Sequence, residues 1–427
     1  MELSGLKHKF NKVIHNKTII NGSLFSLFSF FGQGMSFVLL ILLANYIQPK
    51  EYGVLSLFTT VVTFAGFIIA FSTRGYPGVT YFKKKVEEFK QDFTAVIVLG
   101  LITFIILALP VVLFGNILGE MLGLSKQLLW YVLIISFFSL IYLLQQDYLR
   151  IKEKVTLYGF FNCGNAILNF ALSILLVITF NQNWMGRVNA MLICSIVFGF
   201  FSCFYIYRHD LIRVRVPQKV YKDALGWGIP MIPHAASGWI RQGLDRYIIN
   251  YYHSIYDVGI FSFALNLSNI IVMIGSAFNS TNSVTLFQVL SDQTLTNDQK
   301  KKKLSSQTRY IIVIYIISTV IVLLSMTILT MFALPKYKES TPLMWILAIN
   351  GLGNSVYFLY CNYLFYYNDT KILMYFTFST SVIHLLLSLA FTRFSLYCTA
   401  LVYGVMMIVM MSLTIWRAKR LIKLNLI

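Results

Sequence analysis

Three charged side chains interrupt an otherwise apolar part of the chain, the segment SGWIRQGLDRYIINYY at residues 237–252. They are Arg241, Asp245 and Arg246. An arginine keeps its charge at physiological pH, and its planar fork of N–H donors fits the oxygen atoms of a phosphate group. An ionisable group in mid-bilayer costs about 2.5–3.5 kcal/mol on insertion scales, so such groups face a bundle interior or a watery cavity. The residue types therefore indicate an anion-binding site.

The spacing of these residues predicts how they share one helix over residues 224–251. His234, Arg241 and Asp245 are seven and four residues apart, which places them on one face. Arg246 lies about 100° round from Asp245. We expect Arg241 and Asp245 to pair, which leaves Arg246 and part of Arg241 to meet an anion. The alternative is an ion pair that only fixes helix packing, and the second arginine favours the anion site.

Two other polar positions are candidates for the same cavity. Arg74 lies in AFSTRGYPGVTYF, where Gly75 and Pro77 must stop or unwind a helix. It is either an anchor at a cytoplasmic helix end or a residue of the cavity floor. Gln33 lies between two glycines in FGQGMSF, which indicates either a flexible point or close helix packing.

Two prolines and a lone histidine are expected to shape or join helices, not to contact cargo. Pro230 and Pro233 remove backbone hydrogen bonds near the start of the charged segment and permit a bend there. His384 stands alone in an apolar helix. We expect it to be a core histidine with a satisfied hydrogen bond, or a contact between helices, rather than a proton relay.

The composition is that of a membrane protein. Of 427 residues, 57% are hydrophobic and only 12% are charged, whereas a soluble domain has about 25% charged residues. The net charge of +19 does not indicate nucleic-acid binding, because the basic residues lie in short patches between apolar blocks. Such patches fit loops that face anionic lipid.

The reactive residues do not indicate an enzyme. There is no GxxxxGK(S/T) motif, and the 16 acidic residues lie almost entirely in loops or at helix ends, without a carboxylate pair or metal cluster in the membrane. The 5 cysteines fall inside apolar blocks without CxxC spacing, so we expect small core residues and not disulfides or metal ligands. No cofactor or metal is expected.

Apolar blocks predict an all-α polytopic protein with about twelve transmembrane helices. Each block has roughly 20 residues, the length of a helix that crosses a bilayer core. Continuous apolar runs without alternation exclude a transmembrane barrel. The expected helices are 22–46, 53–73, 93–114, 128–146, 157–180, 186–207, 224–251, 258–287, 310–333, 341–366, 372–391 and 395–416.

The distribution of basic residues predicts how the chain is oriented in the membrane. With the N-terminus inside, 27 of the 35 Lys and Arg residues lie on the cytoplasmic side and 6 outside, while Arg241 and Arg246 remain within a helix. Both termini are therefore expected in the cytoplasm. The basic loops 208–223 and 288–309 both belong inside, so the charged segment 224–251 has to cross between them.

An internal repeat divides the predicted helices into two sets of six. EYGVLSLF, at residues 51–58, resembles DVGIFSFA, at residues 257–264, so that Gly53 matches Gly259. The alternative is a chance similarity of small and apolar residues. A parallel repeat predicts six-helix lobes at residues 1–210 and 211–427 around a central cavity, with one lobe rocking against the other.

Two segments resemble a known family. GQGMSFVLLILLANYIQPKEYGVLSLF and DRYIINYYHSIYDVGIFSFA, which open the two halves, resemble Wzx-type flippases of O-antigen and capsular polysaccharide repeat units. These belong to the multidrug/oligosaccharidyl-lipid/polysaccharide exporter superfamily. The resemblance implies two helical lobes and a V-shaped cavity whose cations meet a pyrophosphate or acidic sugars. Arg241 and Arg246 match that role by position, with Arg74 as a companion.

The expected function is that of a flippase in the bacterial plasma membrane. The resemblance implies that it moves undecaprenyl-pyrophosphate-linked oligosaccharide to the outer leaflet by alternating access, with membrane lipids and a polysaccharide polymerase as further partners. One rival is an ion-coupled multidrug exporter, whose cationic cargo would favour carboxylates over the two Arg and one Asp found here. The others are a membrane scaffold and a polymerase, and a polymerase would be expected to have a large outer loop.

Overall fold

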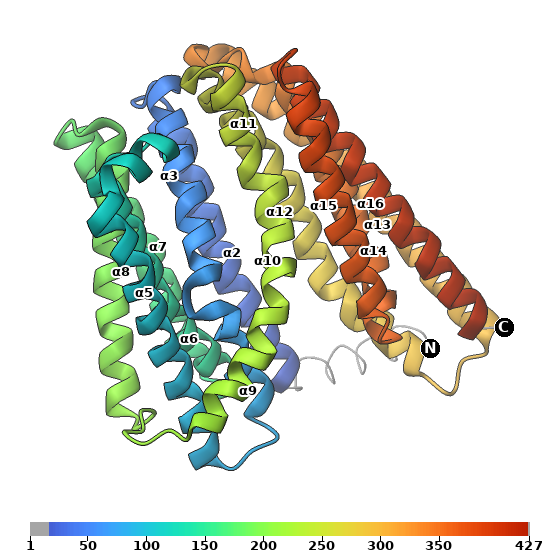
Figure 1. Cartoon of the computed structure of the whole chain (residues 1–427). Helices are drawn as coiled ribbons and strands as arrows, with labels where there is room; N and C mark the ends of the chain where they lie inside the picture. The colour runs from blue at the N-terminus through green and yellow to red at the C-terminus, as the bar shows by residue number, and fades with distance from the viewer. Residues whose placement is uncertain (1–16, 426–427) are drawn as a thin grey trace. The chain divides into compact units, whose positions relative to one another are not determined.

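The computed structural model describes residues 17–425, and every secondary-structure element in that part of the chain is helical (Figure 1). The first half contains α2 (Lys17–Ala44), α3 (Pro49–Ile68), η1 (Ile69–Gly75), α4 (Tyr76–Thr80), α5 (Val86–Leu122), α6 (Lys126–Ile151), α7 (Val155–Ile174), η2 (Leu175–Thr179), α8 (Asn183–Arg208) and α9 (Gln218–Gly228). The second half contains η3 (Ile229–Met231), α10 (Ile232–Trp239), η4 (Ile240–Leu244), α11 (Asp245–Tyr252), α12 (Ile255–Ser291), α13 (Asn297–Ile328), η5 (Leu329–Ala333), η6 (Pro335–Tyr337), α14 (Ser340–Tyr366), α15 (Thr370–Phe391) and α16 (Leu396–Asn425).

The predicted all-α membrane fold is confirmed. Eleven helices in the described residues are long and apolar enough to cross a membrane. The charged segment is not one of them, because its charged and polar residues lower its mean hydropathy. The elements η3 and η4 also interrupt its α-helical geometry. Its crossing of the membrane stays a prediction. The break at η3 lies at Pro230, where a bend was expected.

Contacts divide the chain into two compact units. The first unit holds the described residues up to Ile47 and those from Val61 to Ile232. The second holds residues 48–60 and those from Pro233 onward. Helix α9 packs on α5 and η1, within the first unit. The six-helix lobes at residues 1–210 and 211–427 stay a prediction.

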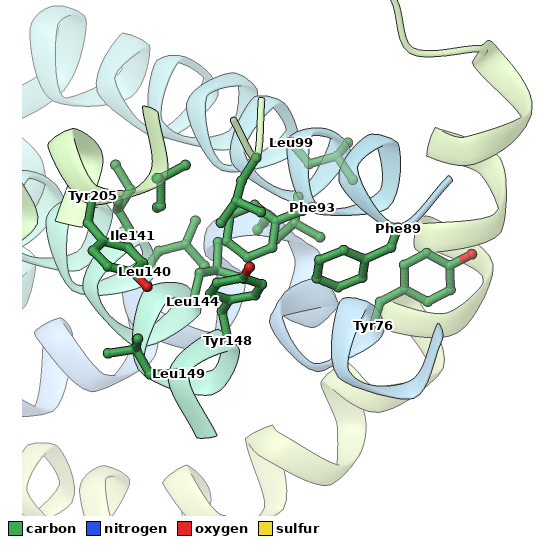
Figure 2. Packing of buried hydrophobic residues seen from close by; sticks show 14 of the residues in the cluster. Tyr76, Phe89, Phe93, Leu99, Leu140, Ile141, Leu144, Tyr148, Leu149 and Tyr205 are labelled. Atoms are coloured by element: carbon green, nitrogen blue, oxygen red, sulfur yellow. The ribbon is translucent and has the colours of Figure 1, made fainter. Parts of the chain in front are cut away.

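Aromatic rings pack among aliphatic side chains in the core of the first unit. Phe89 and Phe93 of α5 pack against Tyr148 of α6, and the rings of Phe89 and Tyr148 stack 6.1 Å apart (Figure 2). Farther along α5, apolar side chains such as Ile105 and Leu109 are exposed instead. An apolar core with apolar exposed faces is what a bundle surrounded by lipid requires.

Charged groups fix the segment that joins α8 to α9. Arg213 donates hydrogen bonds to Glu87 of α5 at 2.7 and 3.0 Å and to Asp210 at 2.8 and 3.0 Å. Lys90 donates to Asp210 at 2.9 Å. These bonds from Arg213 and Lys90 lower the pKa of the Asp210 carboxyl, because they stabilise its charged form.

The helix break expected near Arg74 is a left-handed turn in η1. Ala70, Phe71 and Ser72 have φ of 59°, 49° and 56°, a conformation that costs a non-glycine residue roughly 1–2 kcal/mol. Side-chain bonds hold it, because Thr103 Oγ1 accepts the N–H of Ala70 at 2.9 Å and Ser72 donates to a carbonyl of α3 at 2.8 Å. Gly228 packs directly against the Phe71 carbonyl oxygen.

A reciprocal contact joins the two predicted repeats within the second unit. A methyl group on Gly53 of α3 would collide with the carbonyl oxygen of Ile255, and one on Gly259 of α12 would collide with that of Pro49. Pro49 and Ile255 are separated by the same 206 residues as Gly53 and Gly259. Equivalent residues of the two repeats thus exchange roles across one contact, as at a two-fold axis. This symmetry supports the repeat.

Candidate functional site

The charged segment of the second unit is built around a π-turn. Arg241 lies in η4, where the backbone forms π-helical hydrogen bonds, and Asp245 and Arg246 open α11. Single π-turns inside α-helices are rare and occur frequently at functional sites. Both arginines are half-buried, whereas Asp245 is 1% exposed. The backbone of His234 lies in α10, but its side chain is outside the described part of the structure.

The guanidinium group of Arg246 is held by neutral partners. Its Nε donates to Ser262 Oγ of α12 at 3.1 Å, and its Nη1 donates to Thr60 Oγ1 of α3 at 2.7 Å. Among the described residues, no carboxylate oxygen lies within 4.0 Å of Arg246. Hydroxyl groups orient the cation but carry no charge, so Arg246 has no direct ion pair among the described residues.

Arg241 is even less satisfied. Its Nη1 contacts the thioether sulfur of Met410 on α16 at 2.8 Å, and its buried Nε has no hydrogen-bond partner among the described residues. A thioether is a weak acceptor, so this contact does little for the charge. The adjoining cavity has a volume of about 20 Å³, which is room for one water molecule. Its lining is Arg241, Gln242, Asn350, Asn354, His384, Tyr403 and Met407.

The expected pair between Arg241 and Asp245 is wrong. The carboxylate oxygens of Asp245 lie 3.0 and 3.1 Å from Nε2 of His384 on α15, and both residues are 1% exposed. In a π-turn the hydrogen bonds run between residues five apart, so positions four apart lose the alignment they have in an α-helix. The imidazole takes the place expected for the guanidinium. The contact between helices expected of His384 is confirmed.

Gln33 lines a large polar cavity inside the first unit. The cavity has a volume of about 640 Å³ and lies between α2, α6, α7 and α8. Four carboxamide side chains line it, together with hydroxyl groups, two aromatic rings and a single charged residue, Arg187. The lining is Ser29, Gly32, Gln33, Ser36, Ile135, Ser139, Tyr142, Leu143, Asn162, Asn165, Ala166, Asn169, Arg187, Met191, Cys194, Ser195 and Phe198.

Arg187 and the asparagines of α7 are site residues that sequence reasoning missed. Arg187, near the start of the expected helix 186–207, lies in α8 and donates hydrogen bonds to Asn169 Oδ1 and, at 2.9 Å, to Ser173 Oγ. The signal in the sequence was the spacing of Asn162, Asn165 and Asn169, three and four residues apart on α7. The buried Oδ1 of Asn162 has no hydrogen-bond partner among the described atoms.

Arg74 forms an ion pair in the first unit. Its Nε lies 3.0 Å from Asp147 Oδ2 of α6, and Arg150 reaches the other oxygen of Asp147 at 4.0 Å. The Arg74 side chain is 44% exposed. Two cations thus share one carboxylate, which leaves this cluster with a net positive charge.

Within the described residues, no group of three or more His, Cys, Asp or Glu side chains could hold a metal ion. The potential ligands that do meet are Asp245 and His384, which satisfy each other.

Known structures share this fold. The lipid II flippase MurJ in an inward closed conformation superposes with a TM-score of 0.71 at 17% identity, covering 94% of this chain and 90% of that one. The inward-facing conformation of a multidrug resistance MATE family transporter of the MOP superfamily gives a TM-score of 0.69 at 11% identity, covering 94% and 95%. The chain therefore has the fold of these transporters.

Sequence comparisons show the family. Protein 1 of the Lsg locus of Haemophilus influenzae is 23% identical over 379 residues, which cover 84% of this chain and 87% of that protein. Residues 20–292, more than half of the chain, match the family described as "Polysaccharide biosynthesis protein". The chain belongs to the polysaccharide biosynthesis protein family.

Proposed function

We propose that the protein is a flippase that moves undecaprenyl-pyrophosphate-linked oligosaccharide from the inner to the outer leaflet of the bacterial plasma membrane by alternating access. The family and the shared fold with a flippase and with multidrug transporters support a transporter of lipid-linked polysaccharide precursors. The proposed orientation has both termini in the cytoplasm, supported by the bias of basic residues. A polysaccharide polymerase is the proposed partner that consumes the product, for O-antigen or capsule.

The observation that carries the proposal is that two guanidinium groups of the second unit have no direct carboxylate partner among the described residues. Arg241 and Arg246 have no carboxylate oxygen within 4.0 Å among the described residues, and they donate hydrogen bonds to a thioether and two hydroxyls. A diphosphate cannot enter hydrocarbon with its charges unpaired, because desolvation of an isolated ion is prohibitive. Fixed arginines in a hydrated passage lower that barrier by offering charge-assisted hydrogen bonds.

Arg241 can reach cargo only after its surroundings change. The cavity beside it admits one water molecule and not a diphosphate. Because Met410 is a flexible side chain and a weak acceptor, a phosphate oxygen would replace it with a large gain in charge compensation. We therefore propose that cargo arrives at Arg246 and displaces Met410 from Arg241, with the π-turn at η4 as the adjustable element.

The cavity around Gln33 is proposed to receive sugars. Carboxamides and hydroxyls donate and accept hydrogen bonds, as sugar hydroxyl groups do, and the rings of Tyr142 and Phe198 offer apolar faces. Its only charged lining residue, Arg187, is hydrogen-bonded to Asn169 and Ser173. A volume of about 640 Å³ falls in the usual range of small-molecule sites.

The alternative of an ion-coupled multidrug exporter shares the fold but not the charge pattern. A cationic drug would be favoured by carboxylates that face a cavity. The two cavities described above have no Asp or Glu in their linings, and the buried Asp245 is paired with His384. The drug exporter is therefore the weaker proposal.

Transport assays in proteoliposomes separate these functions. Arg246→Ala should abolish translocation of undecaprenyl-pyrophosphate-linked oligosaccharide while the protein remains folded, and Arg246→Lys should restore only part of it, since lysine lacks the planar fork. Arg393→Ala, which removes a positive charge from the loop between α15 and α16, is the matched control. Wild-type transport by Arg246→Ala, or drug export without oligosaccharide transport, would contradict the proposal.

A further inference from the structure

A second basic cavity lies in the second unit, separate from the charged segment. It has a volume of about 450 Å³ and is formed by α13, α14 and α16, of which α14 packs against the other two (Figure 1). None of its lining residues belongs to α10, η4 or α11. The lining is Lys301, Leu304, Ser305, Thr308, Arg309, Ile312, Val313, Tyr360, Tyr363, Lys419 and Ile422.

Three cations line this cavity without a carboxylate. Lys301 and Arg309 are eight residues apart on α13, which places them on one face of the helix, and Lys419 comes from α16. Among the described residues, no carboxylate oxygen lies within 4.0 Å of any of the three. Like charges gathered around one cavity repel each other, and a bound anion removes that repulsion.

The first turn of α13 fixes the position of Lys301. The N-terminus of α13 has a capping box between Thr296 and Gln299. The next residue, Lys300, is buried and donates a hydrogen bond to the Leu290 carbonyl of α12 at 2.9 Å. Lys301 therefore projects from an anchored turn, whereas Lys302 and Lys303 are exposed and do not line the cavity.

The remaining walls of the cavity are mainly apolar and aromatic. Leu304, Ile312 and Ile422 line it together with the rings of Tyr360 and Tyr363. Farther along α13, between residues 311 and 324, the exposed side chains are all apolar, and they are Val313, Ile316, Ile317, Val320, Ile321 and Leu324. An anion that carries a hydrocarbon chain would contact both the cations of the cavity and the apolar face of α13, whereas free phosphate would contact only the cations.

We propose that this cavity binds the phosphate head group of an anionic phospholipid, with an acyl chain along the exposed apolar face of α13. Basic pockets between transmembrane helices are recognised sites for anionic lipid head groups. The hydroxyls of Ser305 and Thr308 also line the cavity and are available as further donors to phosphate oxygens. The bound lipid joins α13 to α16 and stabilises the second unit.

Native mass spectrometry of the full-length protein in detergent tests this site with defined lipids. Phosphatidylglycerol should bind, while phosphatidylethanolamine and inorganic phosphate should bind at least about tenfold more weakly. Lys301→Gln/Lys419→Gln should lower phosphatidylglycerol affinity about tenfold or more. Lys302→Gln/Lys303→Gln removes the same charge outside the cavity and should change the affinity less than about twofold.

Other results overturn the proposal. Equal losses in both double variants would mean general surface attraction, and equal binding of inorganic phosphate would mean a site for free phosphate. Val313→Trp keeps every charge and should weaken the lipid by filling the acyl position, so unchanged binding would also contradict the site. Arg246→Ala should bind phosphatidylglycerol normally, which separates a failure of this site from a failure of the flippase proposal.

Discussion

Asp245 and His384 form a buried pair, with both carboxylate oxygens within 3.1 Å of Nε2, between helices that are 139 residues apart in sequence. Ser388 Oγ lies 3.4 Å from the same nitrogen, and the ring of Tyr403 meets the imidazole edge-on. The pair fixes α11 against α15 at the point where the π-turn ends. It therefore holds the backbone that carries Arg241 and Arg246.

Removing one member of this pair should destabilise the second unit. His384→Ala leaves a carboxylate buried without its partner, a change that typically costs about 3–5 kcal/mol. The free energy of unfolding, measured by SDS titration in mixed micelles, should fall accordingly. Asp245→Asn/His384→Ala removes the charge as well and should recover part of the loss. Additive losses in the double variant would contradict a direct pair.

Arg241 and Asp245 should behave as independent residues, because the carboxylate is paired with His384 and not with the guanidinium. Arg241→Ala is expected to lower transport of the lipid-linked oligosaccharide with little loss of stability, since only a thioether contact is broken. Arg241→Ala/Asp245→Ala should be less stable than Arg241→Ala. The thermal unfolding temperature and the transport rate of both variants test this expectation. If Arg241→Ala/Asp245→Ala were more stable or more active than Arg241→Ala, the result would indicate an Arg241–Asp245 ion pair and contradict the structure.

The cavity of the first unit should select for the sugar part of the cargo. Gln33→Leu removes an exposed carboxamide from the lining, so it should raise the KM for undecaprenyl-pyrophosphate-linked oligosaccharide several-fold, by losing a hydrogen bond worth about 1 kcal/mol. Transport of undecaprenyl pyrophosphate without sugar should not change. Gln127→Leu, on the exposed start of α6, is the control. An equal effect on both substrates would exclude a sugar site.

Gly228 should be required by the left-handed turn in η1. Gly228→Ala places a methyl group against the Phe71 carbonyl oxygen and Thr73, which should destabilise the first unit by about 1–3 kcal/mol. Gly226→Ala, two residues earlier in α9, meets nothing within 4 Å and should be neutral or stabilising by up to about 1 kcal/mol. Gly228→Ala should therefore lower the thermal unfolding temperature, whereas Gly226→Ala should leave it unchanged or raise it. Equal shifts in the unfolding temperature would mean that the left-handed turn can move to accommodate the added methyl group.

The membrane helices were predictable because each depends on local composition alone. An apolar block of roughly 20 residues has few alternatives in lipid, since the backbone must satisfy its own hydrogen bonds. The charged segment stands out in the sequence because its side chains are out of place in an apolar chain. Sequence spacing then misassigned the partner of Asp245, since a π-turn changes the alignment of residues four apart.

The partner residues were not predictable, because they come from distant helices. Nothing near Asp245 in sequence indicates His384, and nothing near Arg246 indicates Thr60, 186 residues away. The polar cavity in the first unit was partly visible in the spacing of the asparagines on α7. Its volume depends on how α2, α6 and α8 surround them, which is a property of the packed unit.

The glycine contact between α3 and α12 bears on how such a chain could arise. Gly53 and Gly259 occupy matching places, and each lies against the backbone of the other repeat. A half-length ancestor with this glycine would present a self-complementary surface, through which two copies would associate as a homodimer. A protein formed by duplication and fusion of that gene would keep the same interface between its two halves. An alanine at either Gly53 or Gly259 would then push α3 and α12 apart at this contact.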